Sequence, residues 1–113
     1  MKRKQLSFKR GFHVAIDEKH AQAAEMTIAP GGEEGGPDNR HRGADQWLFV
    51  VSGSGEARIE GRKLGLVPGM LVLIERGEKH EICNTGAEAL KTLNFYVPPA
   101  YTKAGNERSP GKS

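Results

Sequence analysis

The sequence predicts an all-β protein in which short antiparallel strands form a sandwich or barrel. Fifteen glycines and six prolines are spread over 113 residues, which favours many turns and disfavours long helices. Short apolar segments recur at intervals of about ten residues, a spacing typical of antiparallel sandwiches and barrels. The length fits one domain, and its core must be modest because only 36% of the residues are hydrophobic.

The expected strands follow one another along the chain with turns between them. The first two, residues 12–16 and 22–28, flank a polar turn, and a glycine- and proline-rich loop at 30–40 follows them. Each later strand is separated from its predecessor by a turn that contains glycine, and these strands are expected at 46–52, 56–60, 63–67, 70–74, 80–84 and 89–97. A single domain of residues 1–113 thus begins with a basic arm, 1–10, and ends in a loose tail, 98–113.

Two of the expected strands are apolar on both faces. Neither the odd nor the even positions are polar along 47–51 and 71–74, whereas a strand with one face in water would alternate. A chain this short, with no expected helix, has little of its own to cover an outer face. We therefore expect a homodimer in which a second sheet, from a partner subunit, supplies the cover.

A basic N-terminal arm can contact nucleic acid, but nucleic acid is not an expected partner of this chain. The net charge is +3, with +5 in the first ten residues, so the remainder carries −2. No recognition motif for nucleic acid accompanies this basic arm, which we interpret as solvated or laid on a partner subunit.

We expect a soluble, cytoplasmic protein without a membrane partner. No apolar run approaches the roughly 18 residues of a membrane span, and the basic start lacks the apolar region of a signal peptide. The single cysteine, Cys83, excludes an internal disulfide and agrees with a reducing compartment. We interpret Cys83 as a small, half-buried strand residue rather than a nucleophile.

Two motifs have an informative spacing. In the second, Gly69, Gly77, His80 and Asn84 fit a glycine, five residues, a proline, one residue and then G-x-x-H-x-x-x-N, with Glu75 in place of the proline. The first motif is H-x-H, three or four residues, a glutamate, six residues and a glycine.

When the first motif is aligned on Gly53, Gln46 takes the glutamate position, His41 the second histidine and Asn39 the first. Together and in this order, the two motifs resemble those of the cupin superfamily, over roughly residues 32–97. The resemblance implies a small one-barrel cupin, a double-stranded antiparallel β-helix of the jelly-roll type.

The resemblance also implies a metal site inside the barrel. In metal-binding cupins the two histidines and the glutamate of the first motif join the histidine of the second around one divalent ion. His41 and His80 match this set, whereas Gln46 and Asn39 each offer a neutral amide oxygen. The expected ion is Zn, Mn, Fe or Ni, held by His41, Gln46, His80 and Asn39, with water as the alternative to Asn39. The other interpretation is an empty barrel in which His41 and Gln46 only form hydrogen bonds.

Other polar residues near the motifs receive different interpretations. Asp45 is a competing carboxylate, but its side chain should point away from the face of Gln46. Asn84 is interpreted as a residue that holds a turn by hydrogen bonding. His13 and His20 belong to no motif and are expected at the surface or in a strand.

A divalent ion held by neutral ligands keeps its full charge and should attract an anionic oxygen. We therefore predict a small, anionic ligand or substrate and a redox-neutral reaction, such as isomerisation or ring opening of a sugar acid. Small cupins that act on unsaturated uronates look similar, with glutamine in the glutamate position.

The alternatives are a non-catalytic, ligand-binding or regulatory cupin, or a metal-dependent dioxygenase. No general acid or base is obvious in the sequence, which leaves the catalytic residues unassigned; Tyr96, Tyr101 and Glu75 are possible ones.

Overall fold

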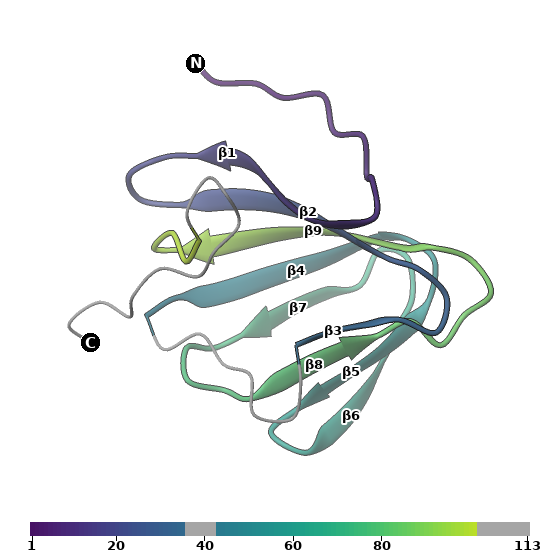
Figure 1. Ribbon diagram of the computed structural model, residues 1–113. Helices are drawn as coiled ribbons and strands as arrows, with labels where there is room; N and C mark the ends of the chain where they lie inside the picture. Colours follow the sequence, from purple (N-terminus) through teal and green to yellow (C-terminus); the bar gives the residue numbers. More distant parts are fainter. Residues whose placement is uncertain (36–42, 102–113) are drawn as a thin grey trace.

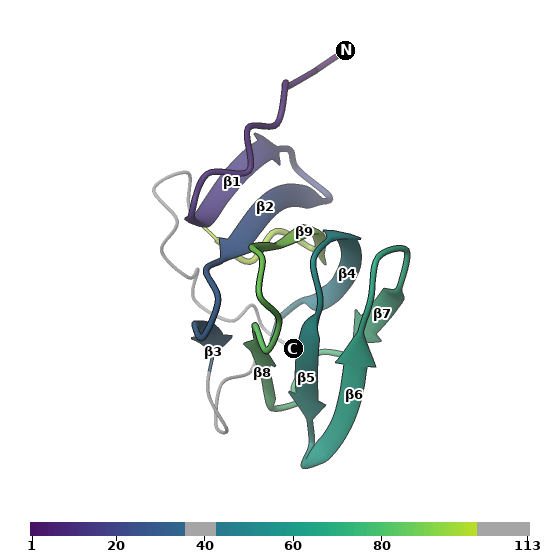
Figure 2. The same ribbon diagram turned by 90° about the vertical axis from the view of Figure 1, so that its right-hand side faces the viewer.

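The computed structural model describes residues 1–35 and 43–101, and all its regular structure is β-sheet (Figure 1). Within these residues nine strands form two antiparallel sheets, which lie one above the other in the view of Figure 2. The all-β, antiparallel architecture expected from the sequence is therefore confirmed. The described residues include no helix that could span a membrane.

The larger sheet has five strands and the smaller sheet four. The order in the larger sheet is β1-β2-β9-β4-β7, formed by β1 (Gly11–Asp17), β2 (Gln22–Ile28), β9 (Leu90–Val97), β4 (Asp45–Ser52) and β7 (Leu71–Ile74). The order in the smaller sheet is β3-β8-β5-β6, formed by β3 (Glu33–Gly35), β8 (His80–Cys83), β5 (Gly55–Ile59) and β6 (Arg62–Leu66). The eight expected strands are present with small shifts at their ends.

Strand β3 is the element that the sequence pattern missed. Its three residues lie in a segment that was predicted as a loop. The prediction followed from the glycines and prolines on both sides, which are typical of loops and leave too few residues for a strand pattern. The strand forms because it pairs with β8, Glu34 lying opposite Ile82. Tertiary pairing thus overrides local propensity here.

The core fills the space between the two sheets. Along β4 the even-numbered residues from Gln46 to Val50 are buried and the odd-numbered ones are exposed, which is the period of a strand with one inward face. Both sheets contribute to the main apolar cluster, which contains Met26, Ile28, Leu48, Val50, Ala57, Leu66, Val72, Ile74, Ile82 and Leu90.

The motif glycines occupy turns that other residues would strain. Gly53 has φ of 85°, and a Cβ atom there would lie 2.3 Å from the carbonyl oxygen of Ala89. In the turn after β7, Gly77 has φ of 86°, and Glu75 stands where the cupin motif has proline. The Glu75 N–H donates to the Glu78 carboxylate at 2.7 Å, a bond that proline could not form.

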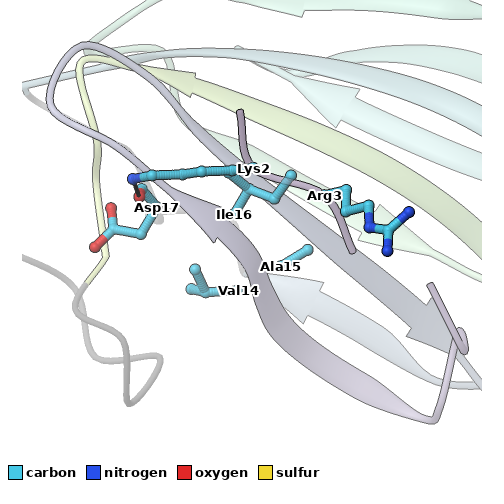
Figure 3. Close-up of a pocket in the computed structure, with 6 residues that line it drawn as sticks. All are labelled: Lys2, Arg3, Val14, Ala15, Ile16 and Asp17. Carbon is cyan, nitrogen blue, oxygen red and sulfur yellow. Dashed lines mark hydrogen bonds between the residues drawn. The ribbon is translucent and has the colours of Figure 1, made fainter. Parts of the chain in front are cut away.

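The N-terminal arm lies against the first two strands. The Phe8 N–H donates to the Glu25 carboxylate at 2.7 Å, and Lys2 Nζ donates to the carbonyl of Asp17 at 2.9 Å. Figure 3 shows Lys2 reaching along β1 to Asp17, beside a hollow of about 390 Å³.

Residues 98–101 return to β2. The Gln22 side chain accepts hydrogen bonds from the N–H groups of Ala100 and Tyr101 at 3.3 and 3.0 Å, and it donates to the Tyr101 carbonyl at 2.7 Å. The tail expected to be loose is thus attached as far as Tyr101, and its remainder lies outside the described residues.

Candidate metal centre

Two of the four expected metal ligands lie in the described residues, and both are in the barrel interior. Gln46, on β4 of the larger sheet, is 2% exposed, and His80, on β8 of the smaller sheet, is 4% exposed. Each alternates along its strand with core residues, Gln46 with Leu48 and His80 with Ile82. Asn39 and His41 lie outside the described residues.

A chain of buried hydrogen bonds fixes the orientation of the Gln46 amide. The chain ends at the carbonyl of Met26, which can only accept, so the Thr92 hydroxyl donates to it, at 3.0 Å. Asn94 Nδ2 then donates to Thr92 Oγ1 at 3.0 Å, and Gln46 Nε2 donates to Asn94 Oδ1 at 2.9 Å. Each step follows from the one before, so the Gln46 amide has its nitrogen toward Asn94 and its oxygen turned elsewhere.

The remaining oxygen, Gln46 Oε1, is buried and has no hydrogen-bond partner among the described residues. Among the described residues, one other buried side-chain atom has no hydrogen-bond partner, namely the hydroxyl oxygen of Thr27. A buried acceptor without a partner costs about 1–3 kcal/mol. Gln46 Oε1 is thus a buried electron-pair donor whose chemistry suits a metal ion or a hydrogen-bond donor.

The hydrogen bond of His80 Nδ1 is compatible with metal binding through the other ring nitrogen. Its Nδ1 lies 3.1 Å from the carbonyl oxygen of Glu78, and because a carbonyl only accepts, Nδ1 carries the proton. The lone pair of the neutral ring is therefore on Nε2. Histidine ligands commonly have their second nitrogen bonded to a carbonyl in this manner. An imidazole nitrogen and an amide oxygen form a donor set that fits a divalent metal ion.

A carboxyl group that the sequence reasoning missed faces the same interior. Glu34 on β3 lies directly opposite Ile82 on β8, and opposed residues of an antiparallel pair share a face. Ile82 is a core residue, so Glu34 is directed between the sheets, and His80 is the next residue of β8 on that face. Burial raises the pKa of Glu34 above its ordinary value. The sequence did not indicate Glu34 as a site residue because the strand that carries it, β3, was not predicted.

The acid or base candidates named from the sequence lie elsewhere or are engaged in packing. Tyr96 is buried, and its ring contacts those of Phe12 and Tyr101 at centroid distances of 6.1 and 5.0 Å. Glu75 is exposed and borders a groove of about 630 Å³ between the edge strands β6 and β7.

The remaining polar residues take the places expected of them. Asp45 accepts hydrogen bonds from the backbone N–H and the guanidinium of Arg76, which hold the pKa of its carboxyl below the ordinary value. Asn84 joins two segments, since its Nδ2 donates to the carbonyls of Ile28 and Glu88, both at 2.8 Å. His13 and His20 are exposed.

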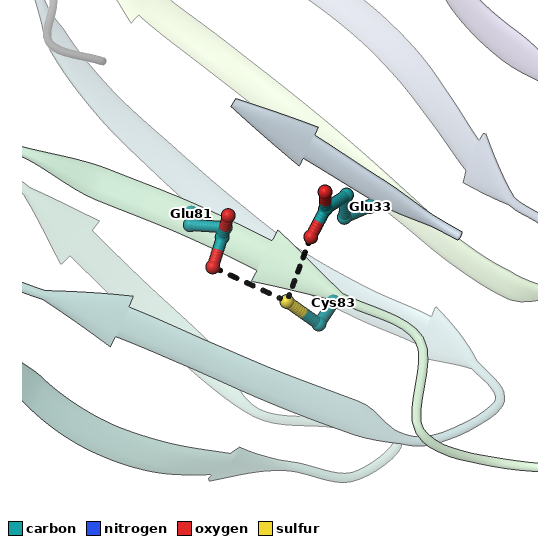
Figure 4. Close-up of side chains that lie close together, drawn as sticks. All are labelled: Glu33, Glu81 and Cys83. Carbon is teal, nitrogen blue, oxygen red and sulfur yellow. Dashed lines mark hydrogen bonds between the residues drawn. The ribbon is translucent and has the colours of Figure 1, made fainter. Parts of the chain in front are cut away.

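A second group of potential ligands lies outside the barrel. Among the described residues, the ligand atoms of Glu33, Glu81 and Cys83 come within 4.8 Å of one another on β3 and β8 (Figure 4). The Cys83 thiol is directed toward both carboxylates, with its Sγ 3.6 Å from Glu81 Oε1 and 3.9 Å from Glu33 Oε2.

Burial and the nearby Glu81 charge raise the pKa of the Cys83 thiol, which favours its protonated form. Arg58 is paired with Glu81 at 3.3 Å. A protonated thiol is a poor metal ligand and a poor nucleophile. The three side chains therefore contact one another without forming a reactive site.

Comparisons with known proteins agree with this architecture. A family model described as "Cupin domain" matches residues 24–96, and the chain belongs to the cupin family. Among curated proteins no significant match is found.

Three solved structures illustrate the likeness. TT1209 from Thermus thermophilus is 20% identical with a TM-score of 0.72, over 80% of this chain and 84% of that one. KdgF from Halomonas sp. is 23% identical with a TM-score of 0.68, over 78% of each chain. A putative sugar phosphate isomerase from Acidithiobacillus ferrooxidans is 26% identical with a TM-score of 0.63, over 72% of this chain and 52% of that one.

Proposed function

We propose that this cupin binds one divalent metal ion and a small anionic molecule in the barrel interior and catalyses a redox-neutral isomerisation or ring opening of a sugar acid. The observation that carries the proposal is Gln46 Oε1, a buried acceptor aimed by a hydrogen-bond chain and without a partner among the described residues. Gln46 and His80 would hold the ion together with His41, and with Asn39 or water as the further ligand. A bound divalent ion supplies Lewis acidity toward an anionic oxygen of the substrate.

Neutral ligands explain the preference for an anionic molecule. At the position where cupins have glutamate, Gln46 contributes no negative charge. A divalent ion bound there would keep its full positive charge and so attract a carboxylate or enolate oxygen. The missing carboxylate also makes the site less suited to stabilising high oxidation states, which disfavours the dioxygenase alternative. The solved structure named as a putative sugar phosphate isomerase supports an isomerisation of an anionic sugar derivative, although its name indicates a phosphate and not a carboxylate.

Glu34 is the group we propose for proton transfer. Isomerisation requires a base that takes a proton from carbon and an acid that returns it, and one carboxyl group can perform both steps. Glu34 faces the interior from β3, and burial raises its pKa above the ordinary value. A non-catalytic, ligand-binding cupin would use the same metal and need no such group.

The experiment is a calorimetric titration of Zn²⁺ or Mn²⁺ into metal-free wild type and metal-free Gln46→Glu. Wild type should bind one ion per chain. Gln46→Glu should bind it about tenfold more tightly, because a carboxylate replaces a neutral oxygen at the same reach. The same substitution should weaken the binding of an anionic probe such as a simple uronate, since it cancels part of the charge that attracts the anion.

The control variant is Asp45→Asn, which changes a carboxylate on the neighbouring residue that is paired with Arg76 instead. Its metal affinity should equal that of wild type. Absent metal binding in wild type, or equal affinity in wild type and Gln46→Glu, would remove Gln46 from the site. Metal and uronate binding without any conversion of the uronate would favour the ligand-binding alternative.

A further inference from the structure

The outer side of the larger sheet carries a continuous set of exposed apolar side chains. We define the apolar face as the outward residues of three adjacent strands, β9, β4 and β7, each between 38% and 58% exposed: Trp47, Phe49, Val51, Leu71, Leu73, Phe95 and Val97. The order of the strands places β4 in the middle of this face.

The strand register makes the face contiguous. Trp47 lies directly between Phe95 on β9 and Leu73 on β7, so three large side chains form one row across the sheet. Phe49 lies between Leu93 and Leu71 in the next row. Side chains opposite each other in an antiparallel pair are in contact distance, and the rows therefore merge into one patch.

The chain's own N-terminal arm covers a different part of this side. Glu25 is on the outward face of β2, opposite Leu93, and it is buried because Phe8 and Ser7 of the arm bind its carboxylate. The cover stops there, and the apolar face begins on the next strands.

The parts of the chain beyond the described residues are chemically unsuited to cover the apolar face. Residues 36–42 and 102–113 contain no leucine, isoleucine, valine, methionine or aromatic residue. Burying an apolar surface needs an apolar partner, and these two segments do not supply one.

We infer that the apolar face is the contact surface of a homodimer, in which a second copy of this chain packs its own apolar face against the first. On typical side-chain areas the seven residues expose about 600 Å², at the upper end of what a monomer leaves in water. Two facing copies bury about 1,200 Å² in total, more than the roughly 1,000 Å² that a specific interface needs.

Twofold symmetry suits this surface. In a twofold dimer the same patch meets itself, so the patch must be complementary to its own copy. An uncharged, apolar sheet face satisfies this requirement, since no like charges are brought together, and two sheets pack face to face at a spacing of about 10 Å. Trp47, in the middle strand, would lie near the centre of the contact.

The test uses Trp47 as a built-in probe, because it is the only tryptophan in the chain. Light scattering of wild type at micromolar concentration should give twice the chain mass of 12.3 kDa. Dilution toward nanomolar concentration should shift the tryptophan emission to longer wavelength as Trp47 becomes exposed to water. A mass of 12.3 kDa at micromolar concentration, with an emission maximum independent of concentration, would overturn the inference.

Substitutions then locate the contact. Leu71→Asp and Leu71→Lys should each raise the dimer dissociation constant at least about 100-fold, because symmetry places every substitution in the contact twice. Arg62→Asp, an acid on the exposed edge strand β6 of the other sheet, should leave the dissociation constant unchanged. Circular dichroism of each variant verifies the fold. A dimer that persists in folded Leu71→Asp, or one that Arg62→Asp disrupts equally, would place the contact elsewhere and overturn the inference.

Discussion

Both faces of the five-stranded sheet depart from the pattern of an ordinary half-buried sheet. Beside the apolar core residues, its inward face carries buried polar side chains, among them those of Gln22, Gln46, Thr92 and Asn94. Its outward face carries the exposed tryptophan, phenylalanine, leucine and valine residues of β4, β7 and β9. An ordinary antiparallel sheet is apolar toward the core and polar toward water.

We infer that both departures serve binding, of a ligand at the inward face and of a second chain at the outward face. Polar groups inside cost free energy unless each is hydrogen-bonded, and Gln46 Oε1 has no hydrogen-bond partner among the described residues. Exposed apolar side chains on the outward face are unfavourable in water, and burying them against a partner would stabilise the complex. The predictions below change one face at a time, with a matched change at a residue that lies outside it.

The largest expected effect is on metal affinity in His80→Ala. The substitution removes an imidazole ligand from the inward side and should weaken Zn²⁺ or Mn²⁺ binding at least about 100-fold, measured by calorimetry. His13→Ala, at an exposed histidine whose ring contacts the Arg10 carbonyl, should bind the metal as wild type does. Equal losses in both variants would mean that binding is not located in the barrel.

An intermediate effect is expected from Asn94→Leu, which interrupts the hydrogen-bond chain behind Gln46. Gln46 Nε2 would be left buried without its acceptor, and metal-free protein should lose about 1–3 kcal/mol of unfolding free energy in urea. Metal affinity should also fall, by about tenfold, because the Gln46 amide is no longer oriented.

Phe95→Leu is the matched change, since Phe95 is the next residue of β9 and lies on the outward face. It should leave metal affinity unchanged and alter only the association of the chains. A loss of metal affinity in Phe95→Leu as large as in Asn94→Leu would contradict the separation of the two faces.

The smallest effect is a dependence of stability on pH that Glu34→Gln should remove. Because the folded pKa of Glu34 lies above its ordinary value of 4.5, the folded state binds more protons in that range than the unfolded state. Stability contributed by this group is thus lost as pH rises from 4.5 toward the folded pKa.

Glu34→Gln should therefore melt at a higher temperature than wild type at neutral pH, and the difference should disappear in acid. Thermal unfolding followed by circular dichroism from mildly acidic to neutral pH measures this. Glu33→Gln, at the exposed neighbouring position, serves as the control. A difference between Glu34→Gln and wild type that is constant over this pH range would show that Glu34 is not buried as its strand register indicates.

The sequence was most informative where a pattern repeats and least where a single contact decides. Strand β2 was predicted with the limits it has in the structure, since apolar residues and flanking turns define it. Strand β3 and its Glu34 were missed, because three residues beside glycines give no periodic signal and the strand depends on pairing with β8. The role of Asn94 could not be predicted either, since it follows from the fixed direction of hydrogen bonds between β9, β4 and β2.

The position of β9 also sets the order of events during synthesis on the ribosome. β9 is the last strand of the described chain, yet it lies in the middle of the five-stranded sheet, between β2 and β4. Until residues 90–97 emerge, the edges of β2 and β4 have no partner, and unpaired strand edges readily join other chains. We therefore expect nascent chains to pass through a stage in which the larger sheet exists only as two separate pieces with unpaired edges.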